Sequence, residues 1–201
     1  MFFWCSSLVI ETLCRQSGGK RVAVACLYCD FHAHNEQSTA HMLGAILKQV
    51  ASGLERIPQE IEAAFQGSKS QLDGRELETG AIVKLLISTL GILKRSYICV
   101  GGLGEFPQAH RPEFFKSLVQ VIQESPGTRL FLTGRPHIEE EMELYFTSMK
   151  VPIKPTEEDI QNYLTMRLSN DTQPRVMSPD LREEILRTIP KKISDMYVQI
   201  S

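Results

Sequence analysis

Four side chains with metal-binding chemistry lie in one short stretch: Cys26, Cys29, His32 and His34. Their spacing, C-x₂-C-x₂-H-x-H, combines thiol and imidazole groups, which are the ligands that zinc prefers. Cys26, however, falls in an apolar run that predicts a strand, and strand residues three positions apart face opposite sides. The chain also has no second ligand pair at zinc-finger spacing. We therefore favour a core thiol beside loop histidines over a zinc-binding module, which stays as an alternative hypothesis.

The turn Ser-Gly-Gly-Lys at 17–20 has the composition of a phosphate-binding loop. Such a loop reads Gly-x-x-x-x-Gly-Lys-Ser/Thr between a strand and a helix, so that backbone N–H groups and the Lys hold phosphates while the hydroxyl binds Mg²⁺. Here Cys14 stands at the first Gly, Arg21 replaces Ser/Thr, and the segment leads into a strand. A turn that ends a helix explains it better. No nucleophile-elbow pattern supports a hydrolase either.

The composition of the 201-residue chain is that of an ordinary soluble globular protein, with 42% hydrophobic and 23% charged residues. Its net charge of −2 gives no electrostatic case for nucleic acid or an anionic membrane. The apolar start is too short to span a bilayer and lacks the charged region of a signal peptide. The odd number of cysteines, mostly in apolar segments, predicts reduced, buried thiols in a cytoplasmic protein.

Hydrophobic patterning predicts strands that alternate with helices. Unbroken apolar runs at 21–28, 96–100 and 128–133 are typical of strands covered on both faces. A shorter strand is expected at 150–153. Apolar stripes and capping residues predict helices at 2–15, 39–54, 58–65, 75–93, 112–124, 138–146, 157–168 and 180–188. We expect Pro190 to end the last helix.

This alternation predicts an α/β fold with a parallel sheet between helical layers, since such crossovers place helices on both faces. In sheets of this kind, chemistry takes place at the carboxyl ends of the strands. The segments that follow the three main strands are Cys29–Asn35, Gly101–Pro107 and Thr133–Pro136.

Two of these strand ends resemble the fungal NACHT-type signalling NTPases, in the nephrocystin-3-like N-terminal group of the STAND class. They read YICVGGLGEFP at 97–107 and LFLTGRPHIEE at 130–140. In that family the first strand usually ends in a hydrophobic residue followed by Asp-Ala-Leu-Asp-Glu-Cys, and the second usually reads Leu-Phe-(Val/Ile)-Thr-Ser-Arg-Pro. The segments 6–13, 26–39, 43–50 and 156–168 fit in the same order, so the resemblance covers nearly the whole chain.

The resemblance implies a three-layer sheet of the ASCE P-loop NTPase type over residues 1–154, followed over 155–201 by a helical extension that begins the next helical subdomain. The family's P-loop would precede Ser6, so we expect the first strand and the P-loop to be absent and the module to be truncated. The strand at 128–133 then has an open apolar edge. The strand at 150–153 closes that edge, or the edge remains an association surface.

The resemblance also places the family's chemistry on this chain. The metal-associated Asp falls on Gly101 and the second Asp on Gly104, so Mg²⁺ lacks acidic groups there. Glu105 matches the Glu that polarises the attacking water, and Arg135 matches the sensor-like Arg near the γ-phosphate. The alternatives are a solvated Glu105 beside a mobile glycine-rich turn, and an Arg135 that pairs with the run Glu139–Glu141.

Two functional hypotheses follow from the resemblance. The first is a degenerate NACHT/STAND signalling pseudo-NTPase that is no enzyme and holds no cofactor. It would act as a protein-interaction or oligomerisation module, with other proteins or further copies of itself as partners and no nucleic acid or membrane. The second is a fragment of an ATP-binding NACHT signalling NTPase whose P-loop lies upstream of Met1, which would bring ATP and Mg²⁺ to the site.

Overall fold

The computed structural model describes residues 2–16, 21–33, 36–70, 77–147, 151–153, 156–170, 178–193 and 198–200. The helices are α1 (Phe2–Gln16), α2 (Thr39–Ser52), α3 (Gln59–Ser70), α4 (Thr79–Gly91), α5 (Arg111–Glu124), α6 (Glu139–Glu143), α7 (Glu157–Ser169) and α8 (Pro179–Ile193). The strands are β1 (Val22–Tyr28), β2 (Arg95–Gly101), β3 (Thr128–Gly134), β4 (Val151–Ile153) and β5 (Val198–Ile200). Short 3₁₀ helices follow the first three strands: η1 (Phe31–Ala33), η2 (Leu103–Glu105) and η3 (Pro136–Ile138).

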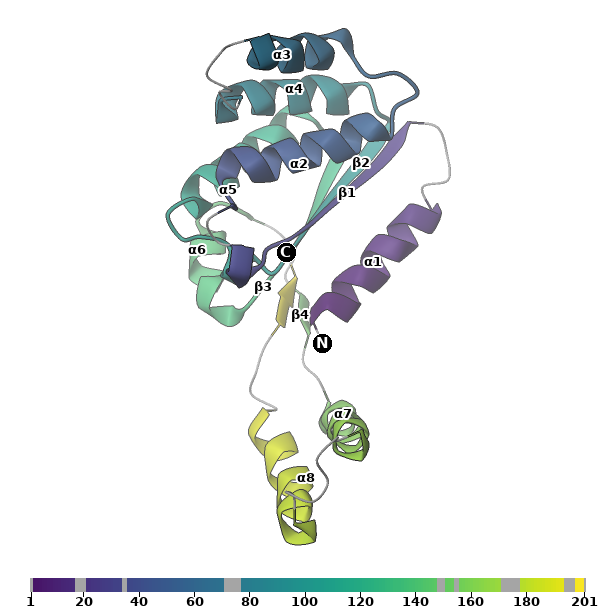
Figure 1. Cartoon of the computed structure of the whole chain (residues 1–201), viewed down its shortest axis with the longest axis vertical. Coiled ribbons are helices and arrows are strands. Elements are labelled where there is room, and N and C mark those ends of the chain that lie inside the picture. Colours follow the sequence, from purple (N-terminus) through teal and green to yellow (C-terminus); the bar gives the residue numbers. More distant parts are fainter. Residues whose placement is uncertain are drawn as a thin grey trace.

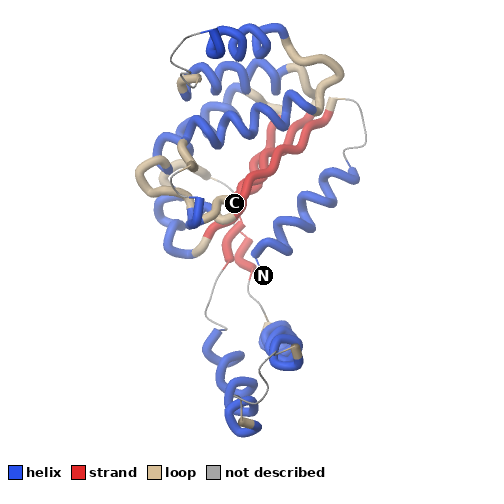
Figure 2. The backbone as a smooth tube through the Cα atoms, viewed as in Figure 1, coloured by secondary structure: helices blue, strands red, loops and turns tan. Residues whose placement is uncertain are grey.

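The strands form one sheet in the order β1-β2-β3-β5-β4. β1, β2 and β3 run parallel, so that Cys26 lies opposite Cys99 and Cys99 lies opposite Phe131. α2 and α5 pack on one face of these strands and α1 packs on the other (Figures 1 and 2). The prediction of an α/β fold with parallel strands is therefore confirmed.

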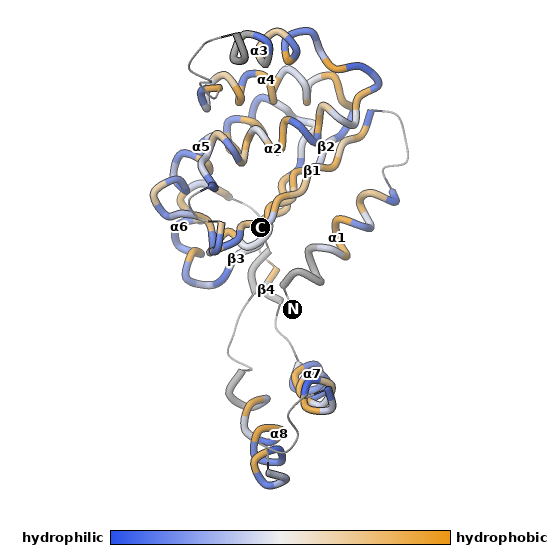
Figure 3. Tube along the Cα trace, in the orientation of Figure 1, coloured by the Kyte–Doolittle hydropathy of each residue, from blue (hydrophilic) through white to orange (hydrophobic). Residues whose placement is uncertain are grey.

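The core lies between the sheet and the helices α2, α4 and α5. On α2 the predicted stripe is buried, with Leu43, Ile46 and Val50 fully enclosed. Burying one Leu or Ile side chain stabilises a fold by about 1.5–3 kcal/mol. Figure 3 shows the resulting pattern, with apolar residues concentrated along the three parallel strands.

The outer edge of β1 is closed by a side chain rather than by another strand. Gln49 of α2 accepts a hydrogen bond from the Cys26 N–H at 2.9 Å and donates one to the Cys26 carbonyl at 2.8 Å. The side-chain amide thus pairs with both backbone groups as a neighbouring strand would.

The other edge of the parallel strands departs from what the sequence predicted. The strand expected at 150–153 forms as β4, but it pairs with β5, a strand that was not predicted. β5 in turn pairs with β3 at Thr133 and Gly134. Among the described residues, 128–132 of β3 therefore have no partner strand on this side. A cavity of about 450 Å³ lies here, lined by residues of α5, β3 and the segment 145–147.

Several helix ends also differ from the predictions. The helix predicted at 58–65 runs on to Ser70 as α3, and the helix predicted at 75–93 spans Thr79–Gly91 as α4. α6 ends at Glu143 instead of reaching 146, because Tyr145 and Phe146 turn back onto the Phe115 ring, with centroids 5.5 Å apart in both pairs. α8 contains Pro190 and runs on to Ile193, so the prediction that Pro190 ends the helix is wrong. A proline removes one N–H and crowds the carbonyl four residues earlier, and the last turn here forms in spite of that cost.

α7 and α8 lie apart from the layered part of the molecule and pack against each other (Figure 1). α7 begins with the capping box that the sequence predicted, in which Thr156 and Asp159 exchange hydrogen bonds. No helix in the described ranges combines the length and the apolar character needed to cross a bilayer.

Candidate functional site

The loops that follow β1, β2 and β3 meet at one end of the sheet, as their positions in the sequence predicted. The Cys29 N–H donates a hydrogen bond to the Gly101 carbonyl at 2.8 Å. The Gly102 N–H donates to the Thr133 hydroxyl at 3.3 Å. Because these bonds link each loop to the next, the three strand ends form a single site.

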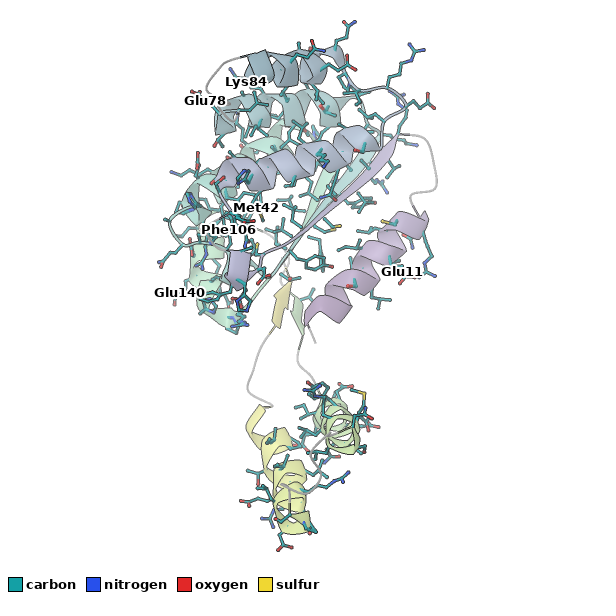
Figure 4. The ribbon with its side chains drawn as sticks, viewed as in Figure 1. Glu11, Met42, Glu78, Lys84, Phe106 and Glu140 are labelled. Carbon is teal, nitrogen blue, oxygen red and sulfur yellow. The ribbon has the colours of Figure 1, made fainter. Side chains whose placement is uncertain are left out.

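The loop after β2, expected to be a glycine-rich turn, folds into the 3₁₀ helix η2. Gly102 adopts a left-handed conformation with φ of 73°, and its carbonyl accepts a hydrogen bond from the Glu105 N–H at 2.8 Å. Leu103 and Phe106 are both fully buried. Phe106 and Met42 of α2, both labelled in Figure 4, belong to the same core cluster. Gly102 permits a tight turn, and the buried side chains of Leu103 and Phe106 hold it in place.

Gly104, where the resemblance implies an acidic residue, packs against an imidazole. A Cβ built on Gly104 would lie 2.8 Å from Cε1 of His137 and 3.7 Å from Cβ of Arg135. Real Cβ atoms do not approach so closely, so any side chain at this position would displace His137. A second carboxylate at this position would therefore need the exposed His137 ring to move.

Glu105 and Arg135 form an ion pair. Nη2 of Arg135 lies 2.7 Å from Oε1 of Glu105. The Arg135 side chain is 60% exposed and the Glu105 side chain is 25% exposed. The pairing was not among the alternatives for either residue. Glu105 is not simply solvated, and Arg135 reaches across to the loop after β2 rather than only along its own segment.

Arg111 is the residue of this site that the sequence analysis missed. It is 9% exposed and binds the loop after β2 from the start of α5. Its guanidinium donates to the carbonyls of Phe106 at 2.9 Å and Gly104 at 3.1 Å, and to Oε2 of Glu141 at 3.1 Å. Its position before Pro112 at the start of α5 carries no recognisable signal, since the partners come from segments up to thirty residues away.

The loop after β1 turns its polar groups toward its own backbone. The Asp30 carboxylate accepts a hydrogen bond from the His32 N–H at 2.9 Å. The buried Gln37 side chain bonds to both backbone groups of Asp30. The pKa of Cys29 is raised to about 12. Burial is the main cause, the nearby Arg111 opposes the rise, and Glu105 adds to it. Cys29 is therefore a protonated thiol at neutral pH and a poor nucleophile or metal ligand.

The proposed zinc ligands do not come together as a group. Cys26 lies on the α1 side of the sheet, opposite Cys99, whereas Cys29 lies beside Arg111 and Glu105. His34 and the Ser-Gly-Gly-Lys turn at 17–20 fall outside the described residues. Within the part of the chain that the structure describes, no three Cys, His, Asp or Glu side chains are placed to hold a metal ion.

The chemistry open to this site is limited by its charge pairing. Glu105 is engaged by Arg135 and Glu141 is engaged by Arg111. Glu105 is also the single carboxylate of the segment 101–107. A bound Mg²⁺ ion needs free oxygen ligands, such as those of carboxylates and phosphates. The paired carboxylates of this site do not fit that requirement.

Comparison with known protein families matches the chain, over residues 4–135, to the family described as Nephrocystin 3, N-terminal. The match covers more than half of the chain and includes all three parallel strands and the loops that follow β1 and β2. Comparisons with curated proteins and with solved structures gave no match.

Proposed function

The chain belongs to the nephrocystin 3 N-terminal family, and on that premise we propose that it is a degenerate NACHT/STAND-type signalling module of the P-loop NTPase class. In this proposal the module does not hydrolyse ATP. It works in the cytoplasm by binding other proteins or further copies of itself.

The observation that carries the proposal is the environment of Gly104. Hydrolysis by a P-loop NTPase requires acidic side chains after the strand that corresponds to β2. Gly101 and Gly104 offer none, and the His137 ring occupies the space beside Gly104. An acidic side chain at position 104 would have to displace the exposed His137 ring.

The ion pair between Glu105 and Arg135 supports the same conclusion. In an active site of this class the Glu would face an attacking water and the Arg would face phosphate. Here the two side chains neutralise each other at 2.7 Å.

Support for an interaction role comes from the open edge of β3. The cavity beside it is lined largely by apolar side chains, among them Val119, Ile122, Leu130 and Phe146. Val119 and Ile122 are only half-buried. Exposed apolar surface next to an unpaired strand favours association with another polypeptide.

Isothermal titration of the full chain with ATP and Mg²⁺ tests the loss of nucleotide chemistry. We expect no binding at micromolar concentrations and no release of phosphate. Micromolar binding that disappears in Arg135→Ala but persists in Arg129→Ala would contradict the proposal and support an ATP-binding fragment instead. Arg129 is a suitable control because it is an exposed arginine elsewhere on β3.

Light scattering at increasing concentration tests the interaction role. We expect the chain to associate and Val119→Glu to reduce that association, because the substitution places a charge in the apolar cavity. Lys116→Glu is the control, since Lys116 is exposed on α5 and does not line the cavity. A chain that stays monomeric at all concentrations would count against self-association.

A further inference from the structure

Two cysteines face α1 from neighbouring strands. Cys26 of β1 and Cys99 of β2 are direct partners in the parallel register, and paired residues of adjacent strands point to the same side of a sheet. On β1 the residues of the opposite face, Ala23 and Ala25, are buried under α2. Cys26 therefore lies on the face that α1 covers.

A third cysteine, Cys14, reaches the same place from α1. The Ser7 hydroxyl lies 3.5 Å from the Tyr28 hydroxyl, which aligns the first half of α1 with the end of β1. Cys14 lies seven residues after Ser7, so it shares that face of the helix about 10 Å further along. α1 runs antiparallel to β1 (Figure 1), so this step leads from Tyr28 back toward Cys26.

The pKa shifts of the thiols agree with this placement. Burial raises the pKa of Cys26, and the neighbouring Cys14 adds to the rise. Burial raises the pKa of Cys99 to about 12, with Cys26 and then Cys14 as further causes. Each of the three thiols therefore lies within electrostatic reach of another.

The three thiols differ in access to solvent. All of them are free, with Cys14 exposed, Cys26 half-buried and Cys99 buried. Cys14 was predicted to be buried, so its exposure is a correction to the sequence analysis. An oxidant from solution meets Cys14 first, and Cys26 is the more accessible of the two thiols beside it.

We propose that Cys14 and Cys26 form a redox-sensitive dithiol that closes to a disulfide when the protein meets hydrogen peroxide. The Cys14 thiolate attacks one peroxide oxygen, so that an S–O bond forms, the O–O bond breaks and hydroxide leaves as water after protonation. The Cys26 thiol then loses its proton and attacks the sulfenic sulfur, so that the S–S bond forms, the S–O bond breaks and the hydroxide leaves with that proton as a second water. Both thiols are oxidised and one peroxide is reduced to two waters.

The disulfide would act on α1. It would close the chain segment from Cys14 to Cys26 and fix the helix against the sheet. α1 is the one described helix that packs on this face of the parallel strands. Oxidation would therefore determine whether α1 is fixed over that face.

Peptide mapping of the oxidised full chain tests the proposal. The protein is treated with one equivalent of hydrogen peroxide, the remaining thiols are alkylated, and the digest is analysed by mass spectrometry without reductant. We expect a peptide that joins Cys14 to Cys26 and disappears with dithiothreitol. The oxidised protein should also have a higher Tm than the reduced one.

Matched variants make the test decisive. The cross-link should be lost in Cys14→Ser and Cys26→Ser and kept in Cys5→Ser and Cys29→Ser. Cys14 is exposed on a helix, so C14S is expected to fold even where C26S does not. A link from Cys14 to Cys99, a disulfide between two chains, or oxidation of Cys14 without a link would each overturn the proposal.

Discussion

The guanidinium of Arg135 lies 2.7 Å from the carboxylate of Glu105, and this ion pair joins the loop after β3 to the loop after β2. The resemblance to signalling NTPases implied that Glu105 would face a water and that Arg135 would face a phosphate. In the structure they bind each other instead. The same two loops are in contact at Gly104 and His137, so the ends of β2 and β3 are closed by polar and steric contacts together.

The Glu105–Arg135 pair should contribute little to stability. Because Arg135 is 60% exposed, a double-mutant cycle of Glu105→Gln and Arg135→Ala in urea unfolding should give a coupling of roughly 0.5 kcal/mol that falls with added salt. The pair Glu11–Arg15 is the control, since both side chains are about two-thirds exposed and lie 3.8 Å apart. A salt-insensitive coupling above about 2 kcal/mol would show that the pair is effectively buried.

Arg111 should be the most sensitive residue of the site. Arg111→Met leaves Glu141 and two carbonyls without their donor, and we expect a loss of about 3 kcal/mol in the free energy of unfolding. Arg129→Met is the control, because Arg129 also bonds to two carbonyls but is exposed and should lose less than about 1 kcal/mol. Similar losses in the two variants would contradict the role given to Arg111.

Glycine should matter at position 102 and be dispensable at position 44. Gly102→Ala forces an alanine to φ of 73° and brings its Cβ within 3.0 Å of the Cys29 carbonyl, so the variant should lose about 1–2 kcal/mol. Gly44→Ala lies in α2 with no atom within 4 Å of the added Cβ and should gain about 0.5–1 kcal/mol. Equal effects in thermal melts would contradict this difference.

The start of α7 should weaken at acidic pH. Hydrogen bonds from the Thr156 side chain and backbone lower the pKa of Asp159 below its ordinary 3.8. A lowered folded-state pKa means that the stabilising contribution is complete above the unfolded-state value and is lost as the pH falls through the folded-state value. The protection of α7 from hydrogen exchange, relative to the intrinsic exchange rate at each pH, should therefore fall below about pH 4. Asp159→Asn should remove this pH dependence, while Glu158→Gln keeps it.

Much of the fold could be predicted because its signals are local. The apolar runs of the three parallel strands and the stripe of Leu43, Ile46 and Val50 on α2 each depend on the period of a single element. The capping box of Thr156 and Asp159 spans one helical turn. The structure contains all of these features, and the strand ends that they position form the site.

β5 and the length of α8 could not be predicted in the same way. Three residues, Val198–Ile200, are too few for a periodic pattern, and their strand exists because β3 and β4 each pair with it. Pro190 is a helix-ending residue by type, but it lies within α8. In both places contacts or chain context outweighed the local preference.

The sequence by itself determined the parallel α/β layout, the loops where chemistry would lie and the absence of acidic groups at Gly101 and Gly104, since each follows from residue type and local spacing. The tertiary structure alone decided which groups meet. Arg135 faces Glu105, His137 packs beside Gly104, and Arg111 binds Glu141 as well as the loop after β2. The partners Glu105 and Arg135, Gly104 and His137, and Arg111 and Glu141 are thirty or more positions apart in the chain, and only the packing of helices and strands brings them into contact.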